Sequence, residues 1–67
     1  MNKLIRFDED HFGFLVGRPI SVDQAKQFGA NFAEKWPGKE LLVFTETDEF
    51  IDLTGKYELI PTPEGME

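Results

Sequence analysis

One stretch of the chain repeats its apolar residues with the period of an α-helix. These residues share one side at 3.6 residues per turn and are Val22, Ala25, Phe28, Gly29, Phe32, Ala33 and Trp36. Ser21 precedes the stretch and Gln24 stands three residues after it, which is the spacing of a capping box. Because Pro37 disfavours helical backbone at the residue before it, the helix is predicted to end near Lys35.

The rest of the chain alternates apolar and polar residues over short runs, which is typical of β-strands. The predicted strands cover residues 3–7, 12–18, 41–45, 50–54 and 57–60. Gly55-Lys56 fits a two-residue hairpin turn between the last two strands. The resulting order is β-β-α-β-β-β. It predicts an α+β fold in which one helix packs on one face of an antiparallel sheet.

Sixty-seven residues are enough for one small domain. That domain is predicted to span residues 1–60. Residues 61–67 contain two prolines and no apolar period, and are predicted to form a flexible C-terminal tail. A chain of this size buries only about 60% of the surface that its unfolded state exposes. Without cysteine it has no disulfide to add stability, so its seven phenylalanines and one tryptophan must supply a tightly packed core.

The register of the strands predicts which residues lie under the helix. A four-residue loop between the first two strands would place Phe7 opposite Phe12. The face under the helix would then carry Ile5, Phe7, Phe12, Phe14, Val16, Leu42, Phe44, Ile51, Leu53 and Ile60. The opposite face would carry Leu4, Leu15, Leu41, Val43, Phe50, Tyr57 and Leu59.

One helix can cover only one face of the sheet, since about 14 residues give a length of roughly 21 Å. Exposed apolar patches of several hundred Å² usually mark an interface. We therefore expect the uncovered face to bind a protein partner or a second copy of the chain. The predicted apolar anchors are Phe50, Tyr57, Leu59, Val43 and Leu41. Two alternatives remain: a one-residue slip in a strand would exchange the faces, and the C-terminal tail could fold over the patch.

Acidic residues outnumber basic residues by 13 to seven, which gives a net charge of −6. This charge opposes direct binding to nucleic acid or to an anionic membrane, and it suits a partner with a basic surface. The acidic residues predicted to contact that partner are Asp8, Glu9, Asp10, Glu46, Asp48, Glu49 and Asp52. The alternative is that acidity only keeps a small protein in solution.

No apolar run reaches the roughly 18 residues of a membrane span. The N-terminus lacks a signal-peptide core, because Arg6 and Asp8 interrupt its apolar residues. The sequence therefore predicts no membrane association and a cytoplasmic location.

No motif in the sequence indicates catalysis. There is no cysteine, and the capping role explains Ser21, the only serine. The acidic clusters at residues 8–10 and 46–49 are predicted at opposite ends of the sheet, where they cannot share a metal. Gly55-Lys56 lacks the other residues of a phosphate-binding loop. We therefore expect no catalytic residues, no metal site and no cofactor.

These observations favour a small, acidic, non-enzymatic interaction protein. It is expected to bind, and thereby inhibit, a protein whose basic surface binds nucleic acid. In size and charge alone it is similar to small acidic bacteriophage proteins that block host defence nucleases. One other hypothesis is a homodimeric accessory protein assembled through the uncovered face. Another is an enzyme or small-ligand module, for which one helix leaves little room for a pocket of about 300 Å³.

Overall fold

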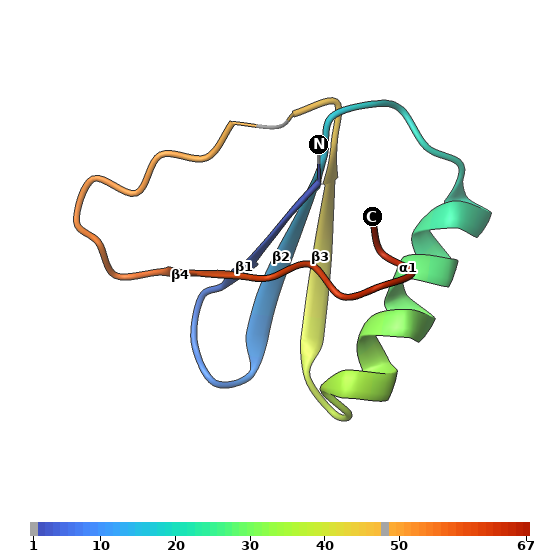
Figure 1. The fold of residues 1–67 in the computed structure, drawn as a ribbon, viewed down its shortest axis with the longest axis horizontal. Helices are drawn as coiled ribbons and strands as arrows, with labels where there is room; N and C mark the ends of the chain where they lie inside the picture. The colour runs from blue at the N-terminus through green and yellow to red at the C-terminus, as the bar shows by residue number, and fades with distance from the viewer. Residues whose placement is uncertain (1, 48) are drawn as a thin grey trace.

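In the part of the chain that the structure describes, four strands form one sheet, and one helix covers one of its faces (Figure 1). The computed structural model describes residues 2–47 and 49–67. Along the chain the elements are β1 (Lys3–Arg6), β2 (His11–Val16), α1 (Val22–Lys35), β3 (Glu40–Thr45) and β4 (Glu58–Ile60). The order across the sheet is β3-β2-β1-β4. The predicted α+β fold, with a helix on one face, is confirmed.

The predicted helix forms with both ends where the sequence places them. Ser21 is its N-cap: the Ser21 hydroxyl accepts from the Gln24 amide at 3.1 Å, and the Gln24 side chain accepts from the Ser21 amide at 3.5 Å. This reciprocal pair satisfies amide groups at the start of the helix that have no intrahelical partner. At the other end the Trp36 amide donates to the Phe32 carbonyl and closes the last turn. The bounds of α1 therefore follow from local sequence chemistry.

The crossover from β2 through α1 to β3 makes these two strands parallel. The chain runs along β2, returns through α1 and then runs along β3 in the first direction (Figure 1). β1 pairs antiparallel with both β2 and β4, so the sheet is mixed. The prediction of an antiparallel sheet is therefore wrong. A 14-residue helix between two neighbouring strands brings the chain back to its starting end, and parallel pairing follows.

The β1–β2 hairpin is one residue tighter than the sequence pattern predicts. The Phe7 amide donates to the His11 carbonyl at 2.9 Å, so the turn consists of residues 8–10. Within this turn the Asp8 carboxylate accepts from the Asp10 amide at 2.8 Å. Such a bond from an aspartate to the amide two residues later stabilises a short turn, and no fourth loop residue is needed.

The shorter turn exchanges the two faces of β1. Leu4 pairs with Phe14 and packs under α1, whereas it was predicted on the uncovered face, the face of the sheet opposite α1. Ile5 pairs with Gly13 and lies on the uncovered face together with Phe7, whereas both were predicted under α1. One residue in the length of the turn therefore relocates three apolar side chains.

The faces of β3 are also reversed relative to the prediction. Parallel pairing with β2 places Leu41 and Val43 under α1, where both pack against the core. Because side chains alternate along a strand, Leu42 and Phe44 lie on the uncovered face, where they are exposed. The prediction relied on an antiparallel partner strand at residues 50–54, and that strand does not form.

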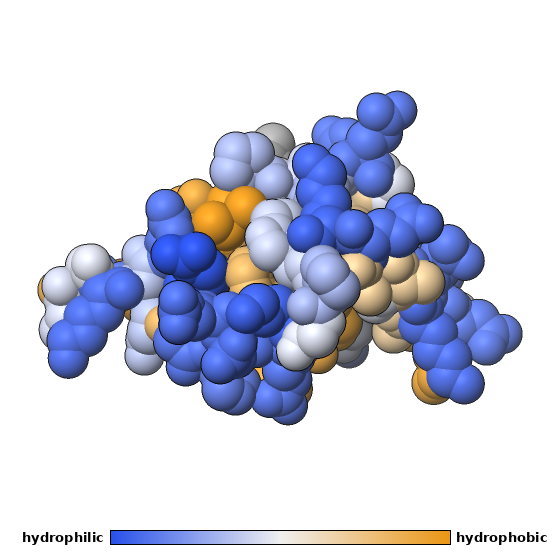
Figure 2. All heavy atoms as spheres, turned by 90° about the horizontal axis from the view of Figure 1, so that it is seen from below, coloured by the Kyte–Doolittle hydropathy of each residue, from blue (hydrophilic) through white to orange (hydrophobic). Residues whose placement is uncertain are grey.

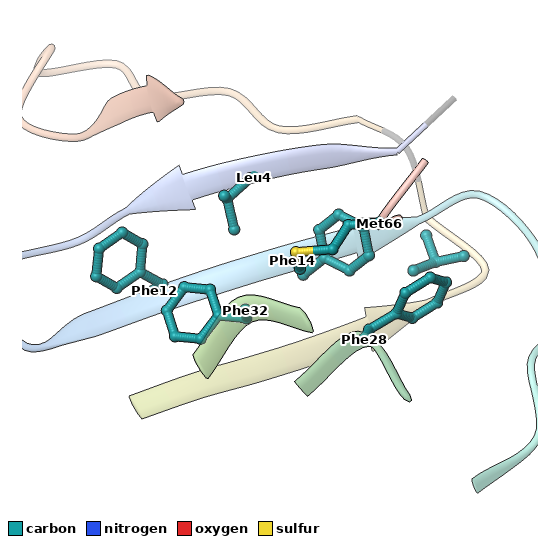
Figure 3. Close-up of a cluster of buried hydrophobic side chains, with 7 residues drawn as sticks. Leu4, Phe12, Phe14, Phe28, Phe32 and Met66 are labelled. Carbon is teal, nitrogen blue, oxygen red and sulfur yellow. The ribbon is translucent and has the colours of Figure 1, made fainter. Parts of the chain in front are cut away.

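The core lies between α1 and the sheet (Figure 3). Its buried side chains are Leu4, Phe12, Phe14, Val16, Phe28, Phe32 and Met66. Two edge-on aromatic pairs hold α1 on β2: Phe12 with Phe32, whose ring centroids are 4.9 Å apart, and Phe14 with Phe28, at 5.1 Å. Trp36 extends this cluster at the end of α1, with its ring centroid 5.3 Å from that of Phe12.

The segment after β4 turns back onto the core. Met66 is fully buried in the core cluster (Figure 3). The Asn31 side chain donates to the Gly65 carbonyl at 2.9 Å, and the Asn2 side chain donates to the Met66 carbonyl at 3.1 Å. Where the sequence pattern predicts a flexible tail, the structure places a buried side chain and two tertiary hydrogen bonds.

Candidate functional site

A long segment crosses the uncovered face of the sheet. After β3 the chain reaches β4 at the opposite edge through the arch, which consists of residues 46–47 and 49–57 (Figure 1). The predicted strand at residues 50–54 does not form, and these residues belong to the arch. Of the predicted strand at residues 57–60, only Glu58–Ile60 forms a strand, β4, and it pairs with β1. The arch therefore decides which parts of the uncovered face remain accessible.

Three aromatic rings attach the arch to the sheet. Tyr57 meets Phe7 edge-on with ring centroids 5.1 Å apart, and Phe50 lies 6.4 Å from Phe7 and 6.2 Å from Tyr57. Phe7 can lie close to the sheet because Gly13 beneath it has no side chain: a Cβ atom there would come within 2.7 Å of the Phe7 ring. The predicted anchors Phe50 and Tyr57 thus also hold the arch in place.

Asp52 organises the backbone of the arch. One of its carboxylate oxygens accepts from the amides of Thr54 and Gly55, at 3.1 and 3.0 Å, and the other accepts from the Tyr57 amide at 2.7 Å. These hydrogen bonds, led by the one from Tyr57, hold the pKa of Asp52 below its ordinary value of 3.8. Asp52 was predicted to contact a partner, and in the structure its carboxylate is bonded to the backbone of its own loop.

Between the arch and the sheet lies an open hollow of about 250 Å³. Its lining residues are Phe7, Leu15, Phe44, Thr47, Glu49 and Phe50. Small-ligand sites usually measure about 300–1,000 Å³, so this hollow is better matched to one or two side chains of a protein. Because Glu49 adds a carboxylate to an otherwise mainly apolar lining, the hollow suits an apolar stem that ends in a positive charge.

Exposed apolar side chains gather on the same side of the molecule. They are Leu42, Phe44, Ile51, Leu53, Tyr57 and Leu59. Leu42 and Phe44 are 49% and 43% exposed although they belong to a β-strand of the sheet. Seen from the end with the β1–β2 turn, hydrophobic atoms form a patch bordered by hydrophilic residues (Figure 2). Several exposed apolar side chains on one side of a molecule, unlike single scattered ones, indicate an interaction surface.

The structure brings together part of the predicted set of anchors. Those on the uncovered side are Phe50, Tyr57 and Leu59. Leu41 and Val43 lie under α1, so their predicted place on this face is wrong. Leu42 and Phe44 occupy it instead, and sequence reasoning missed them. A helix between β2 and β3 implies that these strands run parallel, so their relative direction was predictable. The register that decides which residues of β3 face α1 has no such signal in the sequence.

The acidic clusters lie at opposite ends of the sheet, as the predicted path of the chain requires. Residues 8–10 precede β2, and residues 46–49 follow β3, which runs parallel to β2. Asp48 lies outside the described residues. In the part of the chain that the structure describes, no group of three histidine, aspartate or glutamate side chains could hold a metal ion.

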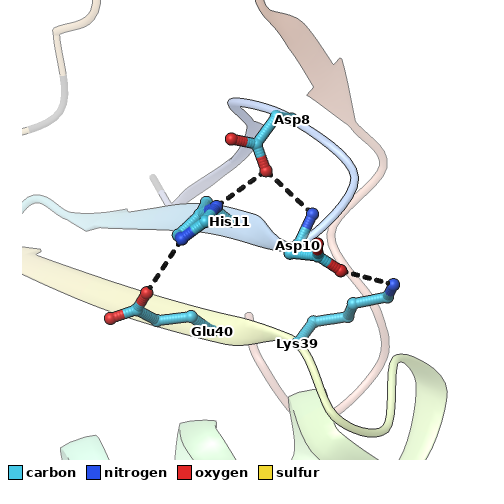
Figure 4. A network of polar contacts seen from close by, with 5 residues as sticks. All are labelled: Asp8, Asp10, His11, Lys39 and Glu40. Carbon is cyan, nitrogen blue, oxygen red and sulfur yellow. Dashed lines mark hydrogen bonds and ion pairs between the residues drawn. The ribbon is translucent and has the colours of Figure 1, made fainter.

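The turn before β2 contains a network of ion pairs (Figure 4). His11 Nδ1 lies 2.7 Å from Asp8 Oδ1, and His11 Nε2 lies 3.2 Å from Glu40 Oε2. Lys39 Nζ donates to Asp10 Oδ1 at 2.9 Å, so the turn is joined to the start of β3. Among the described residues, the predicted acidic contacts that have no ion-pair partner include Glu9, Glu46 and Glu49.

The pKa of His11 is expected to lie above its ordinary value of 6.5, because the ring hydrogen bonds to Asp8 and the charges of Asp8 and Glu40 add to the effect. The folded-state pKa then exceeds the unfolded one. The stabilising contribution of these contacts is therefore complete below pH 6.5 and is lost as the pH rises through the folded-state pKa. Since the chain has one histidine, a proton NMR titration of its ring measures this pKa directly.

Two variants test the cause of the raised pKa. Asp8→Asn removes the hydrogen-bonded carboxylate and should lower the pKa of His11. Asp23→Asn removes the same charge from the first turn of α1 and should leave the titration unchanged. If the His11 pKa stayed high in Asp8→Asn, the contact with Asp8 would not be its main cause.

A second open hollow, of about 480 Å³, is lined by Asn2, Arg18, Thr62 and Glu67. Its volume is larger than expected from the sequence and falls within the range of small-ligand sites. The four lining side chains are polar: one cation, one carboxylate, one amide and one hydroxyl. The uncovered face combines a hollow with exposed apolar side chains, and this combination makes it the candidate functional site.

Comparison with known proteins does not assign the chain to a family. No protein-family model, no curated protein and no solved structure matches it. Within the described residues, no helix has both the length and the apolar character that crossing a membrane requires.

Proposed function

We propose that this protein binds another protein through the uncovered face of its sheet, without catalysing a reaction. The observation that carries the proposal is the apolar patch around the 250 Å³ hollow, where Leu42 and Phe44 remain exposed on a β-strand. Because α1 covers only the other face, this apolar area stays in contact with water in the isolated chain. A bound partner would remove it from water, and that is the main favourable term in protein association.

The partner in this proposal has a basic surface. Glu49 lines the hollow, and Glu46 directly follows β3 near the exposed Phe44. Together with a net charge of −6, these carboxylates would speed the encounter with a cationic surface. The nucleic-acid-binding groove of a nuclease is such a surface. A protein seated in that groove would inhibit the enzyme by excluding the phosphates of its substrate, and we propose a phage-type inhibitor of a host defence nuclease as the setting.

Apolar and acidic residues of the face are expected to affect different steps of binding. Phe44→Ala should mainly speed dissociation and weaken the affinity by about 30-fold, which corresponds to the roughly 2 kcal/mol lost at a buried anchor. Glu49→Gln should mainly slow association and reduce its dependence on salt. Asp23→Asn removes an equal charge from α1 and serves as the matched control.

The test starts from tagged protein in a nuclease-treated bacterial lysate, at low and at high salt, followed by binding kinetics with each captured protein. The proposal is supported if the captured partner has a basic surface, dissociates faster from Phe44→Ala and associates more slowly with Glu49→Gln. Equal responses to Glu49→Gln and Asp23→Asn would reject charge-guided binding at this face. A stable pair in light scattering at high micromolar concentration would favour the homodimer instead.

A further inference from the structure

β3 is an edge strand with one open side. It pairs with β2 and stands at the end of the order β3-β2-β1-β4. The Glu40 amide donates to the Asp10 carbonyl at 2.8 Å, so the backbone of Glu40 faces β2. In a parallel pair every second residue bonds to the same neighbour, so Leu42 and Phe44 also face β2. The residues whose amides and carbonyls point away from the sheet are Leu41, Val43 and Thr45.

The open side of β3 lacks the features that usually protect a sheet edge. β3 has six residues with no proline and no lysine, and the positive φ of 59° at Glu46 comes only after the strand. The opposite edge is better protected: β4 has three residues, Pro61 follows it, and Arg6 pairs with Glu58 at 3.3 Å. Of the two edges, β3 alone offers a long template for an added strand.

Side chains on both faces of β3 could pack against an added strand. On the uncovered face, Leu42 and Phe44 are about half exposed. On the helix side, Leu41 and Val43 are only partly buried against the core. An extended polypeptide beside β3 would therefore cover apolar surface on both faces, while its backbone would bond to the outward amides and carbonyls.

We propose that β3 binds an extended, basic segment of the partner, which joins the sheet as a fifth strand. This inference rests on the proposed function and specifies how the partner is held. Two carboxylates bracket the strand: Glu40 at its start, whose Oε2 also lies 3.2 Å from His11 Nε2, and Glu46 directly after its end. An added strand with lysine or arginine near both ends would meet opposite charges at both positions.

A second copy of the chain fits this edge less well. The antiparallel self-pairing that brings all three outward-facing residues of β3 opposite one another is centred on Val43. In that register Glu40 of each copy would lie opposite Glu46 of the other. Like charges directly opposite each other destabilise a strand pair, whereas a basic strand would neutralise them. The charge pattern therefore selects a different, cationic chain as the occupant.

Amide hydrogen exchange measured by NMR tests the added strand residue by residue. The probe is a synthetic, end-blocked peptide of six residues that alternates lysine with valine, and the control peptide alternates glutamate with valine. In the free protein the amides of Leu42 and Phe44 should exchange slowly, and those of Leu41, Val43 and Thr45 quickly. With saturating lysine peptide, the three outward amides should gain protection of about tenfold or more. The glutamate peptide should have no effect.

A matched pair of variants tests the same edge. Thr45→Pro removes an outward amide and leaves the bonds between β3 and β2 in place, which is why proline is tolerated at sheet edges. Thr45→Ala keeps that amide. The lysine peptide should bind Thr45→Ala as it binds the wild type and should not bind Thr45→Pro. Circular dichroism and urea unfolding establish whether both variants are folded. If one of them is not, the exchange pattern of the wild type with the lysine peptide still tests the inference.

The outcomes separate this inference from the proposed function. If the lysine peptide binds but perturbs only the side chains of Phe44, Tyr57 and Leu59, the inference of an added strand is wrong. The proposal of a partner with a basic surface would still hold. If the lysine peptide does not bind at millimolar concentration, the inference of an added strand is also wrong. The proposed function is tested separately, by the binding kinetics of the captured partner. If the outward amides are already protected in the protein without peptide, and if this protection increases with protein concentration, the occupant is a second copy. That result would overturn the proposal.

Discussion

Met66→Ala is expected to lower the free energy of unfolding by about 2–5 kcal/mol, the usual cost of truncating a large buried side chain and leaving a cavity. Met66 is fully buried in the same cluster as Leu4 and Phe14. A chain of 67 residues has a total free energy of unfolding of roughly 3–10 kcal/mol at typical values per residue. The substitution would therefore remove a large share of the stability of the domain.

Urea unfolding followed by circular dichroism measures the effect of Met66→Ala. The matched control is Glu67→Ala at the exposed neighbouring position, which should change the free energy of unfolding by less than about 0.5 kcal/mol. If Met66→Ala had the same urea midpoint as Glu67→Ala, the last turn would not contribute to the core. In that case residues 61–67 would behave as the flexible tail that the sequence pattern predicts.

Phe32→Ala should have an effect of about 3–5 kcal/mol on the same free energy, because it empties the centre of the contact between α1 and β2. The Phe32 ring packs against two others, with centroid distances of 4.9 Å to Phe12 and 5.1 Å to Trp36. Aromatic pairs of this geometry add about 0.5–1.5 kcal/mol beyond the apolar area that they bury. Loss of Phe32 therefore removes two such pairs as well as the buried area of one ring.

The control for Phe32→Ala makes the same chemical change on the other side of the sheet. Phe44 is 43% exposed, so Phe44→Ala should cost much less, about 1 kcal/mol, in the same urea experiment. The contrast also keeps the proposed function testable, because Phe44→Ala must remain folded for its loss of binding to be informative. Equal losses of stability in the two variants would mean that the uncovered face is as tightly packed as the core.

The helix was predictable from the sequence because all of its determinants are local. Ser21 and Gln24, three residues apart, form the capping box, and Pro37 acts on the residue directly before it to end the helix. The buried positions Phe28 and Phe32 also follow from the helical period. Each of these signals acts over less than two turns, so no knowledge of the rest of the fold is required.

The register of the strands was not predictable in the same way, because it depends on one residue in a turn and on the direction of a partner strand. A turn of residues 8–10 rather than four residues exchanged the faces of β1. Parallel pairing through α1 exchanged those of β3. Met66 stands alone among prolines and polar residues, so no periodic pattern marks it as a core residue. These are tertiary effects that a local pattern does not contain.

The candidate site shows the same division. Phe50, Tyr57 and Leu59 were placed on the correct side through a predicted hairpin of residues 50–54 and 57–60, but no strand forms at residues 50–54. Phe50 and Tyr57 reach that side through the arch, and Leu59 reaches it through the pairing of β4 with β1. The exposed pair Leu42 and Phe44 was missed through the reversed faces of β3. The bonding of Asp52 to three amides of its own loop was also missed, since an acidic residue near a predicted turn is read first as a surface charge.

Trp36 and Tyr57 lie on opposite sides of the sheet and give the molecule two separate optical signals. It is the only tryptophan, and its ring lies against Phe12 and Phe32 at the end of α1, so its fluorescence emission reports whether the helix is docked on β2. The only tyrosine, Tyr57, lies on the opposite side of the sheet against Phe7. A partner on the uncovered face would therefore change the tyrosine signal and leave the tryptophan emission in place, so that binding and unfolding can be distinguished in a single sample.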